Sequence, residues 1–129
     1  MPLDGRQPPR GGAAEALAAA RIVSEEEAHD AMEVLRRTIA PIGVARGDMV
    51  RAEAMLRHIK SLEMTFSDER STSAQERDAY ASDRYRDAID AYRSATVSFE
   101  TLKAERETAS MVIEVYRTQR ASERAATRM

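Results

Sequence analysis

The sequence predicts an all-α fold: a long antiparallel helical hairpin with a preceding N-terminal helix, assembling into a homo-oligomer. Two stretches carry this prediction, residues 43–66 and residues 83–125, because apolar or small side chains recur in both at alternating spacings of three and four. This heptad pattern is typical of long helices that pack against other helices. A short polar connection separates the two stretches, which favours an antiparallel hairpin.

Composition sets the limits of this prediction. A chain of 129 residues is one domain by length, and 33% charged residues with only 5 glycines are typical of a helical, surface-rich protein. The absence of cysteine excludes a disulfide framework, thiol catalysis and cysteine-type zinc sites. A net charge of −2 gives no global basic field, and no apolar run approaches the roughly 20 residues of a membrane span. We therefore expect no membrane association and a cytoplasmic location.

The N-terminal part divides into an arm and a first helix. Residues 1–12 hold three of the four prolines and three of the five glycines, so we expect residues 1–23 to form a flexible arm before a hairpin domain at 24–129. A capping box at residues 24–27 then starts a helix of about 24–40. Pro41 ends or kinks this helix, because its ring lacks an N–H and cannot follow in regular helix. The apolar face comprises Ala28, Ala31, Met32, Leu35 and Ile39.

The two hairpin helices follow. The helix at 43–66 has one polar seam member, Glu63, among Ile42, Ala45, Met49, Ala52, Leu56, Ile59 and Phe66. A second capping box at residues 73–76 predicts a helical turn through about Tyr80, and Ser82 caps the helix at 83–125. That helix has one charged seam member, Arg106, among Tyr85, Ala88, Tyr92, Ala95, Phe99, Leu102, Ala109, Ile113 and Tyr116.

The hairpin register sets which seam residues meet. We expect Phe66 opposite Tyr85, which brings Ile59 near Tyr92, Leu56 near Ala95 and Met49 near Leu102. In this register Glu63 and Arg106 lie far apart, so we expect each to reach solvent or to meet an opposite charge from another subunit.

The back face of the long helix, opposite its seam, carries no charge. Its residues also recur at four and three, which predicts burial by residues 24–40 or by a neighbouring subunit; chance exposure of single apolar residues is the alternative. We favour a homo-oligomer. The candidate interface is Val97, Thr101, Ala104, Thr108, Met111 and Val115, with Arg106.

Motifs for catalysis are missing. His29 shares a helix face with Glu25 and Glu33, but no matching ligand set follows, and a solvated face explains the three residues. The sequence contains neither the Glu-x-x-His pairs of di-iron bundles nor a glycine-rich phosphate loop. We therefore expect no enzyme activity, no cofactor and no metal.

Two basic groups are candidate nucleic-acid contacts. The first lies on the shorter hairpin helix and comprises Arg51, Arg57, His58 and Lys60. The second is a C-terminal stripe at spacings of three, four and four, comprising Arg117, Arg120, Arg124 and Arg128. Such residues can neutralise phosphates. A solvated helix end or a surface for an acidic partner remains an alternative for the stripe.

The basic helix end, the polar turn and the start of the long helix at Asp83-Arg84-Tyr85 resemble those of UvsY-type recombination mediators, small helical-hairpin proteins that tailed phages encode beside their recombinases. The resemblance covers residues 45–125. It implies a ring-forming homo-oligomer in a bacterial host that binds single-stranded DNA and helps to load a RecA-type recombinase onto DNA coated with single-strand binding protein, or a similar role beside an annealing protein. It also implies that Arg57 and Lys60 contact DNA. The acidic net charge departs from the family pattern.

Two other function classes remain open. Residues 67–83 hold five acidic and two basic groups, which suits a protein-only adaptor or an inhibitor of a host nuclease that docks on a basic partner. A structural coiled-coil subunit without a ligand is the third possibility.

Overall fold

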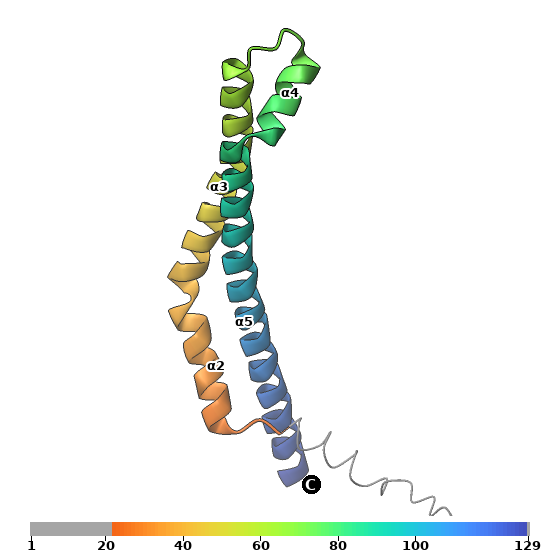
Figure 1. Ribbon diagram of the computed structural model, residues 1–129. Coiled ribbons are helices and arrows are strands. Elements are labelled where there is room, and N and C mark those ends of the chain that lie inside the picture. Colours follow the sequence, from red (N-terminus) through yellow and green to blue (C-terminus); the bar gives the residue numbers. More distant parts are fainter. Residues whose placement is uncertain (1–21, 129) are drawn as a thin grey trace, which may run out of the picture. The chain divides into compact units, whose positions relative to one another are not determined.

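The computed structural model describes residues 22–128, and all regular structure in that range is helical. The helices are α2 (Glu25–Arg37), α3 (Ile39–Phe66), α4 (Thr72–Ala81) and α5 (Asp83–Thr127), shown in Figure 1. The prediction of an all-helical fold is confirmed. The flexible arm predicted for residues 1–23 lies outside the described residues, except for its last two positions.

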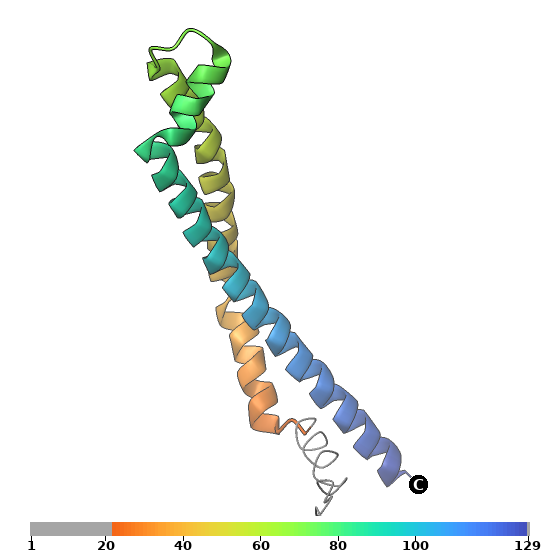
Figure 2. The ribbon, with the colours of Figure 1, turned by 45° about the vertical axis from the view of Figure 1, so that its right-hand side comes forward.

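The described chain divides into two compact units. The continuous unit comprises residues 37–105, and the two-segment unit combines residues 22–36 with residues 106–128. The helix α5 is unbroken (Figure 2) and contributes its first half to the continuous unit and its second half to the two-segment unit. In the continuous unit α3, α4 and the first half of α5 pack together, and in the two-segment unit α2 packs on the second half of α5.

The break between the first two helices lies at Thr38, ahead of the predicted position. The helix α2 ends at Arg37 instead of residue 40, and α3 begins at Ile39, so that Pro41 lies in its first turn. A proline is tolerated in a first turn, where its missing N–H has no intrahelical partner. Its ring clashes with the carbonyl four residues earlier, which is that of Arg37, and the preceding helix therefore ends there.

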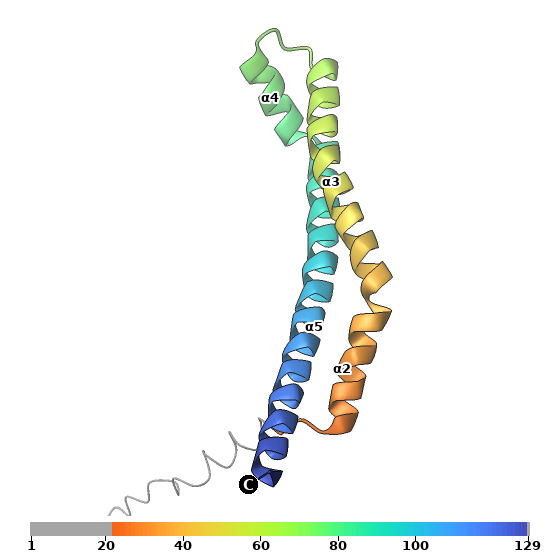
Figure 3. The ribbon, with the colours of Figure 1, turned by 180° about the vertical axis from the view of Figure 1, so that it is seen from behind.

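In the continuous unit α3 and the first half of α5 lie side by side, and their arrangement is hairpin-like (Figures 1 and 3). The seam residues of both helices are half-buried or buried, with Phe66 as the exception at 66% exposure. Arg84 Nε lies 3.8 Å from Glu63 Oε1. In the predicted register Arg84 lies opposite residue 67, so this ion pair places the two helices in a different register from the predicted one.

Packing of α4 against the hairpin explains this difference. Tyr80 of α4 meets Tyr85 of α5 edge to face, with 5.2 Å between ring centroids and 71° between planes. Tyr85 thus packs on α4, where the sequence predicted contact with Phe66. Ala79 is fully buried, so the backbone of α4 approaches its neighbours closely. The register prediction was wrong because it treated the connection as a passive linker.

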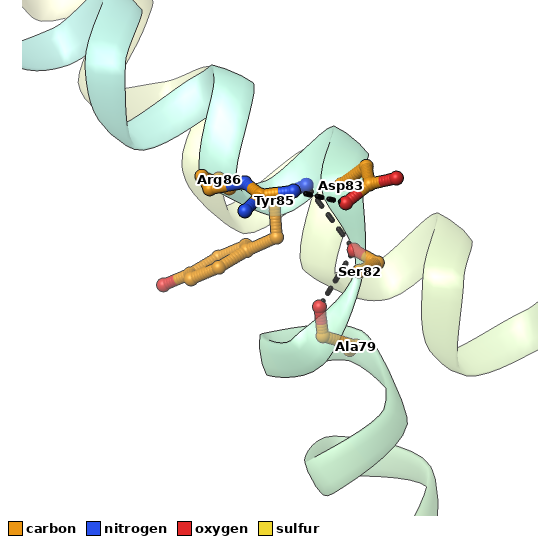
Figure 4. Close-up of polar contacts among 5 residues, drawn as sticks. All are labelled: Ala79, Ser82, Asp83, Tyr85 and Arg86. Carbon is orange, nitrogen blue, oxygen red and sulfur yellow. Dashed lines mark hydrogen bonds and ion pairs between the residues drawn. The ribbon is translucent and has the colours of Figure 1, made fainter.

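Caps define the ends of these helices. The Ser71 hydroxyl accepts a hydrogen bond of 3.2 Å from Ala74 N, so the N-cap of α4 lies two residues before Ser73, the predicted one. The Ser82 hydroxyl accepts from Tyr85 N at 3.1 Å, as predicted, and also donates to the Ala79 carbonyl at 2.7 Å (Figure 4). Asp83 and Arg86 form an ion pair in the first turn of α5. One serine side chain therefore joins the end of α4 to the start of α5.

In the two-segment unit α2 runs alongside the second half of α5 (Figures 1 and 3). Ala28, Ala31 and Ala109 are buried, and their small side chains permit close approach of the two helices. Ser24 caps α2 as predicted, with its hydroxyl accepting from Glu27 N at 3.0 Å. Met32 was predicted to join the buried face but is 49% exposed. The buried stripe of α2 is thus narrower than predicted. Ile39, assigned to the same face, is also exposed and begins α3.

Candidate functional site

The described helices offer surfaces rather than an enclosed chemical centre. Within residues 22–128 no three His, Asp or Glu side chains converge as metal ligands, and His29 with its two glutamates is exposed or half-buried on α2. No helix among α2–α5 combines the length and apolarity that crossing a membrane requires. The candidate binding surfaces are the basic groups, the uncharged back face of α5 and the grooves of the continuous unit.

Lys60 has a structural contact inside the continuous unit. Its ammonium lies 4.9 Å from the centroid of the Tyr80 ring and 3.5 Å from Glu76 Oε1. Hydrogen bonding to the Tyr80 side chain raises the pKa of Lys60 above its ordinary value, and the negative charge of Glu76 acts in the same direction. The side chain thereby links α3 to α4. Because this ammonium already contacts an aromatic ring and a carboxylate, its interaction with a phosphate would be weaker than that of a solvated lysine.

The other basic residues of α3 are exposed. Arg57 carries a side chain that is 82% exposed and lies 3.9 Å from Glu53 one turn earlier, a loose ion pair. His58 is exposed beside it. Arg51 is also exposed but lies on another side of α3, at the rim of a groove. The α3 group is therefore split: Arg57 and His58 face outward, Lys60 is engaged with α4, and Arg51 borders the groove.

The arginine stripe lies on the last turns of α5. Arg117 is 3.6 Å from Glu114 Oε1 and Arg120 is 3.7 Å from Glu123 Oε2, and all four of these side chains are at least 60% exposed. Arg124 donates to the Arg120 carbonyl of its own helix at 3.3 Å. Arg128 follows at the end of the described chain and is exposed. Ion pairs as exposed as these are weak, and the arginines stay accessible to an external anion.

The uncharged back face of α5 is exposed along its whole length. Val97 is 57% exposed, Met111 is 68% exposed and Val115 is 36% exposed, and the threonines and alanine between them are exposed as well. Residues 24–40, one of the two coverings that the sequence allowed, leave this face open. In each unit the part of α5 that carries these residues thus has an uncharged, exposed face, on a helix that is otherwise densely charged.

The two charged seam residues both have partners within this chain. Arg106 is half-buried, and its guanidinium donates to the Leu35 carbonyl of α2 at 2.7 Å. Glu63 has a side chain that is only 19% exposed and pairs with Arg84. These two partners were not predicted, because α2 packs on α5 and because the hairpin register differs from the predicted one. The sequence did indicate a helix end before Pro41. Such an end leaves carbonyls such as that of Leu35 available to a donor like Arg106.

Two adjoining hollows in the continuous unit were not predicted from the sequence. The first, of about 500 Å³, lies between α3 and α5 and is lined by Asp48, Arg51, Ala52, Met55, Ile59, Arg84, Asp87, Ala88 and Ala91. The second, of about 540 Å³, is lined by Ala40, Pro41, Val44, Ala45, Asp48, Ser94, Ala95 and Ser98. Asp48 borders both, so the hollows form one groove along the two helices. Seam periodicity alone does not reveal a groove, because its depth depends on how far apart the helices pack.

The chemistry of these surfaces has to be inferred from their own residues. Comparison with protein-family models, with curated proteins and with solved structures finds no match to this chain.

Proposed function

We propose that this chain is a non-enzymatic recombination accessory protein that forms a homo-oligomer, binds single-stranded DNA and assists a RecA-type recombinase or a single-strand annealing or binding protein. The observation that carries the proposal is the exposed, uncharged back face of α5. Large apolar side chains such as Val97 and Met111 stand on it at 57% and 68% exposure. An extended apolar face of this kind marks a protein interface. The partner surface belongs to another copy of this chain, because the resemblance to UvsY-type mediators implies a ring-forming homo-oligomer.

Two exposed basic regions support the DNA part of this proposal. Arg57 and His58 face outward on α3, and the arginine stripe faces outward at the end of α5. Arg57 is also a DNA contact that the family resemblance implies. Lys60, the other implied contact, stays with Tyr80 and Glu76, and its main role is to hold α4. Oligomerisation multiplies weak sites, so a chain of net charge −2 gains affinity by avidity rather than by a strong local field.

The mechanism follows from mass action. A protein that binds one DNA assembly more tightly than another shifts the equilibrium toward the first by its difference in binding free energy. Binding to the recombinase-coated strand in preference to the strand coated by single-strand binding protein would load the recombinase without any covalent step.

Fluorescence anisotropy with a labelled oligo(dT) tests DNA binding. We expect binding at 50 mM salt that weakens steeply at 200 mM, because each neutralised phosphate releases counterions. Arg57→Ala should weaken binding and flatten the salt dependence, and Arg120→Ala with Arg124→Ala should do the same if the stripe contributes. Arg36→Ala, an exposed arginine of α2 outside both basic regions, is the matched control. Absence of binding at 50 mM salt would refute the DNA part.

Light scattering coupled to size exclusion tests the assembly. Val97→Lys with Met111→Lys should reduce the oligomer size, since each subunit would then place charge on an apolar contact. Ser110→Lys, which adds the same charge on a different side of α5, should leave the size unchanged. A wild-type chain that is monomeric at tens of micromolar would overturn the assembly proposal.

The second candidate, a protein-only adaptor or nuclease inhibitor, is favoured by a different observation. Lys60, Arg117 and Arg120 already have carboxylate partners within the chain, whereas Asp68 and Glu69 in the connection before α4 are exposed. Such a surface suits a basic protein partner. Pull-down from a nuclease-treated lysate separates the candidates, because a DNA-bridged partner is lost and a direct protein partner is retained. A purified oligomer that retains no partner and binds no DNA would leave the structural coiled-coil subunit.

A further inference from the structure

The groove of the continuous unit runs beside α3 from Ala40 to Ile59, which corresponds to about 30 Å of helix. On its α5 wall, Arg84 and Asp87 line one end, and the stretch beyond them carries small side chains, among them the exposed Ala91, Ser94 and Ser98. Small residues on one wall allow another helix backbone to approach closely. The α3 wall carries the larger apolar side chains Val44 and Met55, which are 64% and 39% exposed. The groove thus has the length for one more helix, and its small α5 residues and apolar α3 residues form a lining that such a helix could pack against.

Charges on the α3 wall have a self-complementary order. The wall reads apolar, acidic, basic, apolar at Val44, Asp48, Arg51 and Met55, with spacings of four, three and four. These positions fall on one side of a helix of 3.6 residues per turn. In an antiparallel pair of such helices, Val44 of one lies opposite Met55 of the other, and Asp48 lies opposite Arg51. An antiparallel copy of α3 therefore matches α3 itself, apolar to apolar and acid to base.

We propose that the groove binds a second copy of this chain, with the two α3 helices antiparallel about a two-fold axis between Asp48 and Arg51. Each α3 then lies in the other copy's groove, against the small residues of α5, and the two continuous units form a four-helix bundle. An isologous interface requires a patch that complements itself, which the α3 pattern provides. A different partner protein would need only a complementary sequence of its own and gives no reason for this order.

The two kinds of contact have different tasks in this pairing. Burial of Val44 and Met55 and close approach over Ala91, Ser94 and Ser98 supply the affinity. The charged pairs flank the two-fold axis, where they penalise wrong registers by placing like charges together. The contact uses α3 and the α5 residues Ala91, Ser94 and Ser98, none of which belongs to the α5 back face, so it goes beyond the proposed function. A chain with both surfaces has one interface for dimers and another for larger assemblies.

Charge reversal tests the pairing in trans. The full-length chain carrying Val97→Lys and Met111→Lys, which disables the α5 back face, is the starting protein and should be a dimer by sedimentation. Asp48→Arg places two arginines opposite each other, and Arg51→Asp places two aspartates opposite each other. Each change should weaken self-association at least about tenfold. An equimolar mixture of the two variants should recover the dimer as a heterodimer, because both charged pairs are then restored between chains.

Recovery of the dimer in the mixture would show that each substitution acts at the interface between chains. Mixing cannot repair a defect in the fold of a single chain. Arg46→Asp changes an exposed residue on a different side of α3 and should leave the dimer intact. Circular dichroism of each variant checks that helicity is kept. Met55→Lys is a second change that should weaken the dimer, and it leaves Asp48 and Arg51 unchanged. Single reversals that dimerise like the starting protein, or a mixture that stays monomeric, would overturn the proposal.

The two proposed interfaces fail in distinguishable ways. A starting protein that is already monomeric, beside a wild-type chain that is oligomeric, refutes the α3 pairing and leaves the α5 contact. A wild-type chain whose size is unaffected by the α5 changes but is reduced by Asp48→Arg refutes the α5 contact and supports the α3 pairing.

Discussion

The guanidinium of Arg106 donates a hydrogen bond of 2.7 Å to the carbonyl oxygen of Leu35, joining the two chain segments of the two-segment unit. Leu35 lies in the last turn of α2, where helix carbonyls lack intrahelical donors. A cationic donor near a helix C-terminus also complements the helix dipole. An arginine that interrupts the apolar seam of α5 is thereby explained by the end of a neighbouring helix.

Arg106→Met should lower the free energy of unfolding by about 1 kcal/mol, because a charged hydrogen bond is lost from a half-buried site while the apolar stem is kept. Urea unfolding measures the loss, and amide exchange should accelerate most in α2. Arg124→Met is the matched control, since Arg124 bonds a carbonyl of its own helix at an exposed position. Equal stability of the two variants would contradict the role given to Arg106.

Ser82→Ala should destabilise the junction of α4 and α5 by about 1 kcal/mol, the usual cost of losing an N-cap. The change removes both the bond from Tyr85 N and the bond to the Ala79 carbonyl. Thermal unfolding followed by circular dichroism provides the measurement. Ser110→Ala, at an exposed position inside α5, should be neutral or slightly stabilising because alanine has the higher helix propensity. Ser82→Asp should recover part of the loss, as aspartate also caps.

The contact of Lys60 with Tyr80 and Glu76 should weaken at alkaline pH. The pKa of Lys60 is raised above 10.5 in the folded chain, so the fold favours the protonated form. Its contribution to stability is therefore complete below pH 10.5 and is lost as the pH rises through the folded pKa. Comparison of wild type with Lys60→Met at pH 9 and above pH 11 measures the loss, and the tyrosines that do not contact Lys60 contribute equally to both proteins. A stability difference that does not shrink with pH would refute the assignment.

Gly43→Ala and Gly47→Ala should each stabilise α3 by about 0.5–1 kcal/mol, because glycine is the weakest ordinary residue inside a helix. A Cβ at either position meets no atom within 4 Å, and neither glycine has a positive φ. Chemical unfolding of each variant measures the gain. The reverse change at an exposed position of the same helix, Ala54→Gly, should cost a similar amount. A loss of stability in either glycine variant would show that a surface not seen in the single chain occupies that space.

The sequence by itself determined the helices and most of their ends. Seam periodicity identified α3 and α5, and Ser24 and Ser82 were correctly assigned as caps. These features depend on side-chain spacing along one helix and on hydrogen bonds between residues three or four apart, both of which are local. The proline rule also predicted a break, although its effect falls four residues before Pro41 rather than at it.

Only the tertiary structure decided which residues meet. A heptad seam carries an apolar residue on every turn, so a hairpin shifted by whole turns still sets apolar residues against apolar residues, and the sequence cannot distinguish such registers. Packing of α4 against Tyr85 selected the register in which Glu63 meets Arg84. The same packing places Lys60 against the Tyr80 ring, and the end of α2 places the Leu35 carbonyl within hydrogen-bond distance of Arg106. The partners of charged groups and the groove beside α3 are long-range outcomes, because they depend on distances between helices that no local pattern specifies.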